Sequence, residues 1–199
     1  MKRYSTFDLI IIAIMAALGL GTKQIIRPLV SLITVPLGIP GGAVVGGFYM
    51  LWLVLTKRLA PKFGTGFLFG LTQALVVMIL PFGSHGIFTL ITYSMPGLAV
   101  DLIDLAFGKK ANGVICSMIE GAIANFVGSL LVLILIFRLA LEPSIFITLI
   151  ALLTGNIGGI ISYYIAKQLA NTLSLDLSID EKKKNKKEEL PIDTPQIGQ

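Results

Sequence analysis

Six long apolar runs, separated by short segments that hold most of the charge, constrain this chain of 199 residues more than any other feature. A helix needs about 20 apolar residues to cross a bilayer core about 30 Å thick, and residues 7–170 have room for six or seven such crossings. Only 14% of the residues are charged, whereas a typical soluble domain has about 25%. The sequence therefore predicts an all-α integral membrane protein, a bundle of about six transmembrane helices.

Prolines, glycines and basic residues interrupt the apolar runs and give approximate bounds for the helices. The run 7–22 follows a basic start and resembles a signal peptide, but the later runs favour a retained helix. Segment 23–37 contains two prolines, so it suits either a bent extension of the first helix or a loop at the outer surface. The other predicted helices span roughly 39–57, 63–82, 87–107, 112–137 and 144–170.

The last 29 residues, 171–199, have a different character from the rest of the chain. They include the run EKKKNKKEEL, no aromatic residue and few large apolar ones. High charge with low hydrophobicity predicts disorder. We therefore expect a membrane domain over 1–170 and a charged cytoplasmic tail over 171–199, which is either solvated or an arm for a partner.

The distribution of basic residues predicts the orientation. With the N-terminus in the cytoplasm, six crossings place 13 of the 16 basic residues on the cytoplasmic side and leave Lys23, Arg27 and Arg138 outside. This agrees with the positive-inside rule. We expect a multi-pass protein of the plasma membrane with both termini cytoplasmic. The net charge of +5 then needs no nucleic-acid partner to explain it.

Pairs of small residues four positions apart allow helices to approach closely in lipid. Such pairs are Ala13 and Ala17, Gly42 and Gly46, Gly66 and Gly70, Ala124 and Gly128, and Gly155 and Gly159. Packing inside the bundle explains most of them. The pair Ala13 and Ala17 is the best candidate for docking another subunit.

Polar and ionisable residues inside the membrane are costly, so they usually face a cavity or pair with each other. Here they are Gln73, Asp101, Asp104, Glu120, Asn125 and Asn156. Asp101 and Glu120 would favour a cationic ligand, and hydrogen bonds between helices are the alternative. Asp104 lies nearer the membrane edge, where Lys109 or Lys110 would pair with it.

Aromatic side chains and the single histidine mark the outer half. Tyr49, Tyr93 and His85 could stack on a flat ring or form hydrogen bonds with it. An interfacial aromatic belt is the alternative and suits Trp52 better. The predicted substrate-binding set is Gln73, His85, Tyr93, Asp101, Glu120, Asn125 and Asn156.

No enzyme signature is present in the sequence. One histidine and one cysteine, Cys116, give no cluster of metal ligands. Ser84 and His85 are adjacent in sequence, which does not make a nucleophile and base arrangement. The phosphate-binding pattern GxxxxGK[ST] is missing. We therefore expect no catalysis, no cofactor, no bound metal and no ATP hydrolysis by this chain.

The layout and three short motifs resemble the S components of energy-coupling factor (ECF) vitamin transporters. The motifs are Ala13–Ala17 (AIMAA), Pro40–Gly47 (PGGAVVGG) and Pro96–Leu102 (PGLAVDL). The last two are similar to the YkoE-type branch, which is associated with thiamine or its hydroxymethylpyrimidine precursor and usually has Glu where Asp101 stands. The resemblance implies capture of a vitamin-like molecule from outside. It also implies docking through Ala13 and Ala17 to a T component, which works with two ATPase subunits.

Two other functions remain open. A stand-alone secondary carrier usually has internal repeats with matching broken helices, and no convincing repeat is present in this sequence. A membrane enzyme would need a catalytic constellation. Ion-driven uptake by the chain alone would favour the carrier, and product formation would favour the enzyme.

Overall fold

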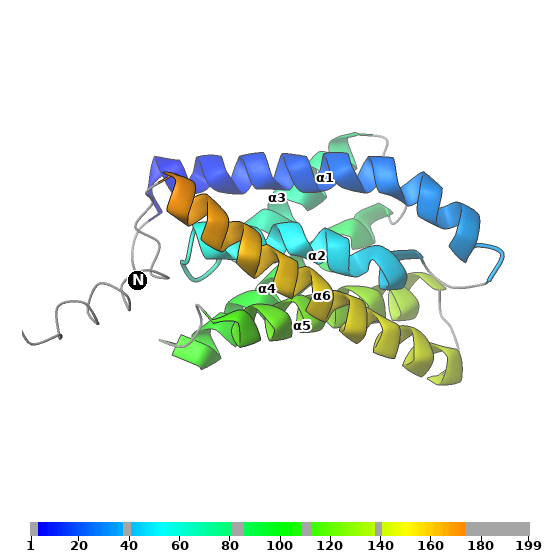
Figure 1. The fold of residues 1–199 in the computed structure, drawn as a ribbon. Helices are drawn as coiled ribbons and strands as arrows, with labels where there is room; N and C mark the ends of the chain where they lie inside the picture. The colour runs from blue at the N-terminus through cyan, green and yellow to red at the C-terminus, as the bar shows by residue number, and fades with distance from the viewer. Residues whose placement is uncertain (1–3, 38–40, 81–85, 109–112, 138–140, 174–199) are drawn as a thin grey trace, which may run out of the picture.

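The computed structural model describes residues 4–37, 41–80, 86–108, 113–137 and 141–173. Within these ranges the regular secondary structure is entirely helical (Figure 1). The α-helices are α1 (Thr6–Thr34), α2 (Gly41–Leu59), α3 (Thr65–Ile79), α4 (Thr89–Phe107), α5 (Val114–Val132) and α6 (Leu141–Leu173). A short 3₁₀ turn, η1 (Gly86–Phe88), precedes α4, and a π-helical turn, η3 (Leu133–Phe137), continues α5.

Among the residues that the structure describes, five helical stretches are long and apolar enough to cross a membrane. They are Thr6–Thr34, Gly41–Leu59, Gly86–Phe107, Val114–Phe137 and Ser144–Thr172. The helix α3 is apolar but has 15 residues, a length of about 22 Å at 1.5 Å per residue. The prediction of a multi-pass all-helical membrane protein is confirmed, although α3 is shorter than a full span. The cytoplasmic location of the termini stays a prediction.

The first helix extends well beyond the predicted 7–22. A capping box begins it: the Ser5 hydroxyl accepts from the Asp8 backbone N–H at 3.2 Å, and the Asp8 carboxylate accepts from the Ser5 N–H at 2.6 Å. The helix then continues to Thr34 with Pro28 inside it. Of the two alternatives for segment 23–37, the helical extension is therefore correct for its first twelve residues.

Close approach at glycines holds the helices together. A Cβ atom on Gly66 of α3 would overlap the carbonyl of Gly97 on α4, and a Cβ atom on Gly97 would overlap that of Gly66. Gly121 of α5 and Gly155 of α6 oppose each other in the same way. Larger side chains would separate these backbones. The structure confirms internal packing for the small-residue pairs of α3 and α6, whereas no other part of the described chain lies within 4 Å of the Gly42 Cβ position.

The alternating helices give the bundle two distinct ends. At one end, which we call the charged end, the Tyr4 hydroxyl donates to the Phe63 carbonyl at 2.6 Å and Lys62 pairs with Asp8. These contacts place the start of α1 beside the turn between α2 and α3. The end of α1, the starts of α2, α4 and α6, and the end of α5 lie at the opposite end, which we call the pocket end.

Candidate functional site

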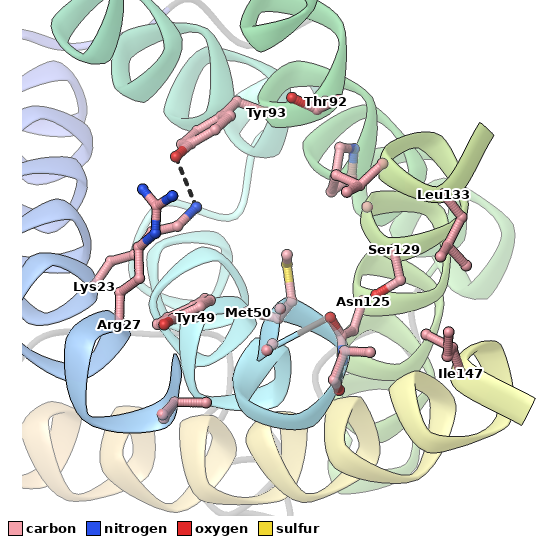
Figure 2. A pocket seen from close by; sticks show the side chains of 18 of the residues that line it. Lys23, Arg27, Tyr49, Met50, Thr92, Tyr93, Asn125, Ser129, Leu133 and Ile147 are labelled. Atoms are coloured by element: carbon pink, nitrogen blue, oxygen red, sulfur yellow. Dashed lines mark hydrogen bonds between the residues drawn. The ribbon is translucent and has the colours of Figure 1, made fainter. Parts of the chain in front are cut away.

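A cavity of about 500 Å³ opens at the pocket end. Its described lining residues come from all six α-helices, and Figure 2 shows the side chains of 18 of them around it. The apolar part of the lining consists mainly of Met50, Leu53, Phe69, Pro96, Leu133 and Ile147. Cavities of roughly 300–1,000 Å³ with an apolar lining and a few polar groups are typical of small-molecule sites.

Two cations on α1 reach into this cavity. Lys23 and Arg27 are four residues apart, so they share one face of the helix, and Figure 2 shows both side chains pointing inward. The Lys23 ammonium donates to the Tyr93 hydroxyl at 2.7 Å. It also lies 4.1 Å from the ring centroid of Tyr93 and 5.2 Å from that of Tyr49. The two tyrosines therefore hold Lys23 through cation–π contacts.

The electrostatic character of the cavity is positive. None of the described lining residues carries a carboxylate, a thiol or an imidazole. Within the part of the chain that the structure describes, neither Lys23 nor Arg27 forms an ion pair. A cavity with two uncompensated cations attracts anions and repels cations.

Asn125 fixes the deep side of the cavity. Its side-chain amide lies within donor distance of the Ala151 carbonyl and the Thr154 hydroxyl, at 2.9 Å each. The Thr154 hydroxyl in turn lies 2.8 Å from the Ala43 carbonyl. These bonds join α5 to α6 and α2. Gln73 does the same for α3 and α1, because its amide donates to the Ala16 carbonyl at 3.2 Å.

The structure brings together three of the seven residues that the sequence suggested for substrate binding. Gln73, Tyr93 and Asn125 line the cavity. Asn156 is not among its described lining residues, and its amide donates to the Leu152 carbonyl of the preceding turn at 3.0 Å. His85 lies outside the described residues. Whether any of them binds substrate stays a prediction.

Asp101 and Glu120, the two carboxylates of that set, lie at the charged end and do not line the cavity. The Lys57 ammonium is 2.8 Å from Asp101 Oδ1, and neither side chain is exposed. Asp101 also accepts from the backbone N–H groups of Gly66, at 3.1 Å, and Phe67, at 2.9 Å. Asp101 therefore joins α2, α3 and α4. This arrangement corresponds to the alternative in which the carboxylates form hydrogen bonds between helices.

The second part of the same network is centred on Arg58. Its guanidinium pairs with Glu120 and lies 3.8 Å from Asp104. Asp104 is also 3.0 Å from the Lys57 ammonium. The partners of Asp104 in the structure are therefore Lys57 and Arg58. The lysines suggested from the sequence, at 109 and 110, fall outside the described residues.

Three side chains of this network have the ligand types of a metal site. Ligand atoms of Asp104, Cys116 and Glu120 lie within 4.8 Å of one another. The Arg58 guanidinium, however, pairs with both carboxylates and lies 3.8 Å from the Cys116 sulfur. A positive group at the centre of the cluster opposes a metal cation there. The contacts are those of a buried ion-pair network.

Sequence reasoning missed Lys23 and Arg27 as cavity residues. Both fall in segment 23–37, where a loop was one of the two alternatives. Their signal was visible nonetheless, because they are two of only three basic residues on the predicted outer side and are four positions apart. Tyr49, which was considered but left out of the predicted set, also lines the cavity.

Comparison with known proteins gives one family match. The family described as "ABC-type cobalt transport system, permease component" matches residues 7–127, more than half of the chain. No curated protein and no solved structure matches. The match covers α1 to α4 and most of α5, and therefore most of the elements around the cavity.

Proposed function

Because the chain belongs to the family of ABC-type cobalt transport permease components, we propose that it is the substrate-specific S component of an ECF-type importer. It is a multi-pass membrane component of an ABC-type transporter. In the proposed role it captures a small organic molecule in the cavity at the pocket end. Partner subunits then use ATP to drive uptake.

The cavity is the observation that carries this proposal. It has the volume of a small-molecule site and lies at the end of the bundle opposite Lys57, Arg58 and Lys62. The positive-inside rule assigns those residues to the cytoplasmic side. The cavity then faces the outside, which is where an import component must bind its cargo.

The proposal requires partners, because the sequence has no phosphate-binding loop. The exposed face of α1 supports docking of a T component. Ala13, Ala17 and Gly21 follow one another at four-residue spacing on this face, and no other part of the described chain lies within 4 Å of the Gly21 Cβ position. Large apolar residues flank them: Ile10, Ile14 and Leu18, each about half exposed. Small residues between large ones are typical of a helix-packing surface in membranes.

The chemistry of the lining supports an organic cargo. Cobalt, named in the family description, binds imidazole, thiolate and carboxylate ligands, and the described lining offers none of them. Of the two molecules that the sequence resemblance favoured, hydroxymethylpyrimidine is neutral and thiamine carries a cationic ring. Lys23 and Arg27 favour the neutral molecule over the cation.

Reconstitution in vesicles tests whether this chain binds the cargo while partner subunits drive its uptake with ATP. Vesicles containing this chain with its T component and ATPases should accumulate the cargo when ATP is present. Vesicles with ATPases whose phosphate-binding lysine is replaced should not. Uptake by the chain alone under an ion gradient would contradict the proposal and favour a secondary carrier. Small molecules that co-purify with the chain, identified by mass spectrometry, supply the cargo for this assay.

A further inference from the structure

Lys23 and Arg27 present more hydrogen-bond donors to the cavity than the described part of the protein satisfies. An ammonium group has three N–H donors and a guanidinium has five. In the described part of the chain, the Tyr93 hydroxyl is the acceptor recorded for Lys23, and no acceptor is recorded for Arg27. These donors are available to a ligand that is rich in acceptor oxygens.

The position of the two cations in a membrane-spanning helix is an electrostatic reason to expect a negatively charged ligand. Both lie in the second half of a helix that is long and apolar enough to cross the membrane. Charges in such segments are costly unless they pair with an opposite charge or reach water. Because the described lining contains no carboxylate, a ligand is the natural source of the negative charge.

The arrangement of the tyrosines and Lys23 disfavours a cationic ligand. Two tyrosine rings around a cavity can form a cage for a cationic ligand. Here the Lys23 ammonium already lies over both rings, at 4.1 Å from the Tyr93 centroid and 5.2 Å from the Tyr49 centroid. A second cation at this position would be repelled by Lys23 and by Arg27.

We propose, on the basis of the function proposed above, that the cargo is an organic anion with a flat ring. Lys23 and Arg27 bind its phosphate or carboxylate group, and Arg27 can do so with two parallel N–H bonds. The ring lies beside Tyr49 and Tyr93, at the parts of their rings that Lys23 does not cover, and packs on the buried apolar side chains of Leu53 and Phe69. The charge of the ligand is therefore recognised by α1 and its ring by α2, α3 and α4.

Three probes that share one aminopyrimidine ring and differ in charge test this assignment. They are thiamine, a cation; hydroxymethylpyrimidine, which is neutral; and hydroxymethylpyrimidine phosphate, an anion. Binding is measured by calorimetry on the full chain in nanodiscs of zwitterionic phosphatidylcholine. We expect the phosphate to bind at least tenfold more tightly than the neutral alcohol, and thiamine to bind most weakly. Thiamine binding as tightly as the phosphate would overturn the inference.

Two variants, one double and one single, test whether the cations on α1 recognise the charge of the ligand. In Lys23→Gln with Arg27→Gln, the preference for the phosphate over the neutral alcohol should fall to about threefold or less. Lys167→Gln, an exposed basic position in the last part of α6 and away from the cavity, should keep the full preference. An unchanged preference in the double variant would also overturn the inference.

A second measurement tests the inference for a cargo whose ring is not an aminopyrimidine. Small molecules retained by the wild-type chain during purification are identified by mass spectrometry and compared with those retained by the double variant. We expect a soluble organic phosphate or carboxylate that the double variant loses. The anion assignment would be overturned if the wild-type chain retained a neutral or cationic molecule, or phospholipid alone. It would also be overturned if the chain retained no molecule and none of the three probes bound. ATP-driven uptake of a neutral molecule would leave the proposed import function intact.

Discussion

Lys57 and Asp101 form an ion pair whose side chains are both completely buried, with 2.8 Å between Nζ and Oδ1. The pair joins α2 to α4, and the backbone N–H groups of Gly66 and Phe67 extend it to α3. Because breaking a buried ion pair is destabilising, this pair helps to hold the charged end of the bundle together.

Replacing Asp101 should therefore lower stability without changing ligand affinity. Asp101→Ala leaves the backbone N–H groups of Gly66 and Phe67 without this acceptor, whereas Lys57 keeps Asp104 as a partner. The expected cost is about 1–3 kcal/mol in the free energy of unfolding for each donor left unsatisfied. Thermal unfolding of the purified protein measures the loss, with Lys167→Gln as the control. The folded fraction should bind its ligand with an unchanged Kd, because Asp101 does not line the cavity. A weakened Kd would restore the sequence-based hypothesis that this carboxylate contacts the cargo.

Two glycines one turn apart on α2 give a matched test of helix packing. A Cβ atom on Gly46 would overlap the Asn125 amide, whereas among the described residues no neighbouring element comes within 4 Å of a Cβ atom on Gly42. Gly46→Ala should destabilise the protein by about 1–3 kcal/mol through overpacking. Gly42→Ala should be neutral or stabilising by up to about 1 kcal/mol, because alanine is the better helix former. Equal unfolding temperatures for the two variants would show that α2 and α5 are not in close contact at Gly46 and Asn125.

The exposed face of α1 should matter for assembly and not for binding. Ala13→Leu with Ala17→Leu fills the space into which a partner helix would pack, so co-purification with the T component should fall at least tenfold. Ligand affinity of the isolated chain should stay the same. Ala106→Leu, at another exposed alanine near the end of α4, provides the same substitution outside this face. If both changes reduce co-purification equally, the docking surface lies elsewhere.

The start of α1 should be sensitive to loss of its cap. Ser5→Ala removes the side chain that accepts from the Asp8 N–H, at an expected cost of about 1 kcal/mol. Asp8→Ala should cost more, because Asp8 accepts from the Ser5 backbone and also pairs with Lys62. Unfolding measurements on both variants test this order. The reverse order would mean that the contact with Lys62 contributes nothing.

The sequence predicted the helices well because hydrophobicity and length determine membrane crossings. Its bounds for α2 and α4 differ from the structure by about two residues. The main difference is at α1, where two prolines suggested a break after residue 22. A single proline removes one hydrogen bond, and neighbouring turns can accommodate that loss in a membrane helix. Pro28 therefore lies inside α1.

The candidate site was harder to predict, because depth in the membrane does not tell which residues share a cavity. Gln73 and Asn125 were identified from their polarity and Tyr93 from its aromatic ring in the outer half, and all three line the cavity. Asp101 and Glu120 are equally polar, but Lys57 and Arg58 from α2 pair with them. The sequence placed those two basic residues just beyond a membrane boundary, so it gave no reason to expect them as buried partners.

The continuity of α1 has a consequence for how cargo could be released. One helix of 29 residues carries Ala13 and Ala17 in its first half and Lys23 and Arg27 in its second. Between Ala17 and Lys23 no proline interrupts it, so a rotation of the first half also moves both cations relative to Tyr49 and Tyr93. In the proposed importer, contact with a T component at one membrane face would thus move Lys23 and Arg27 near the other, with no additional moving part.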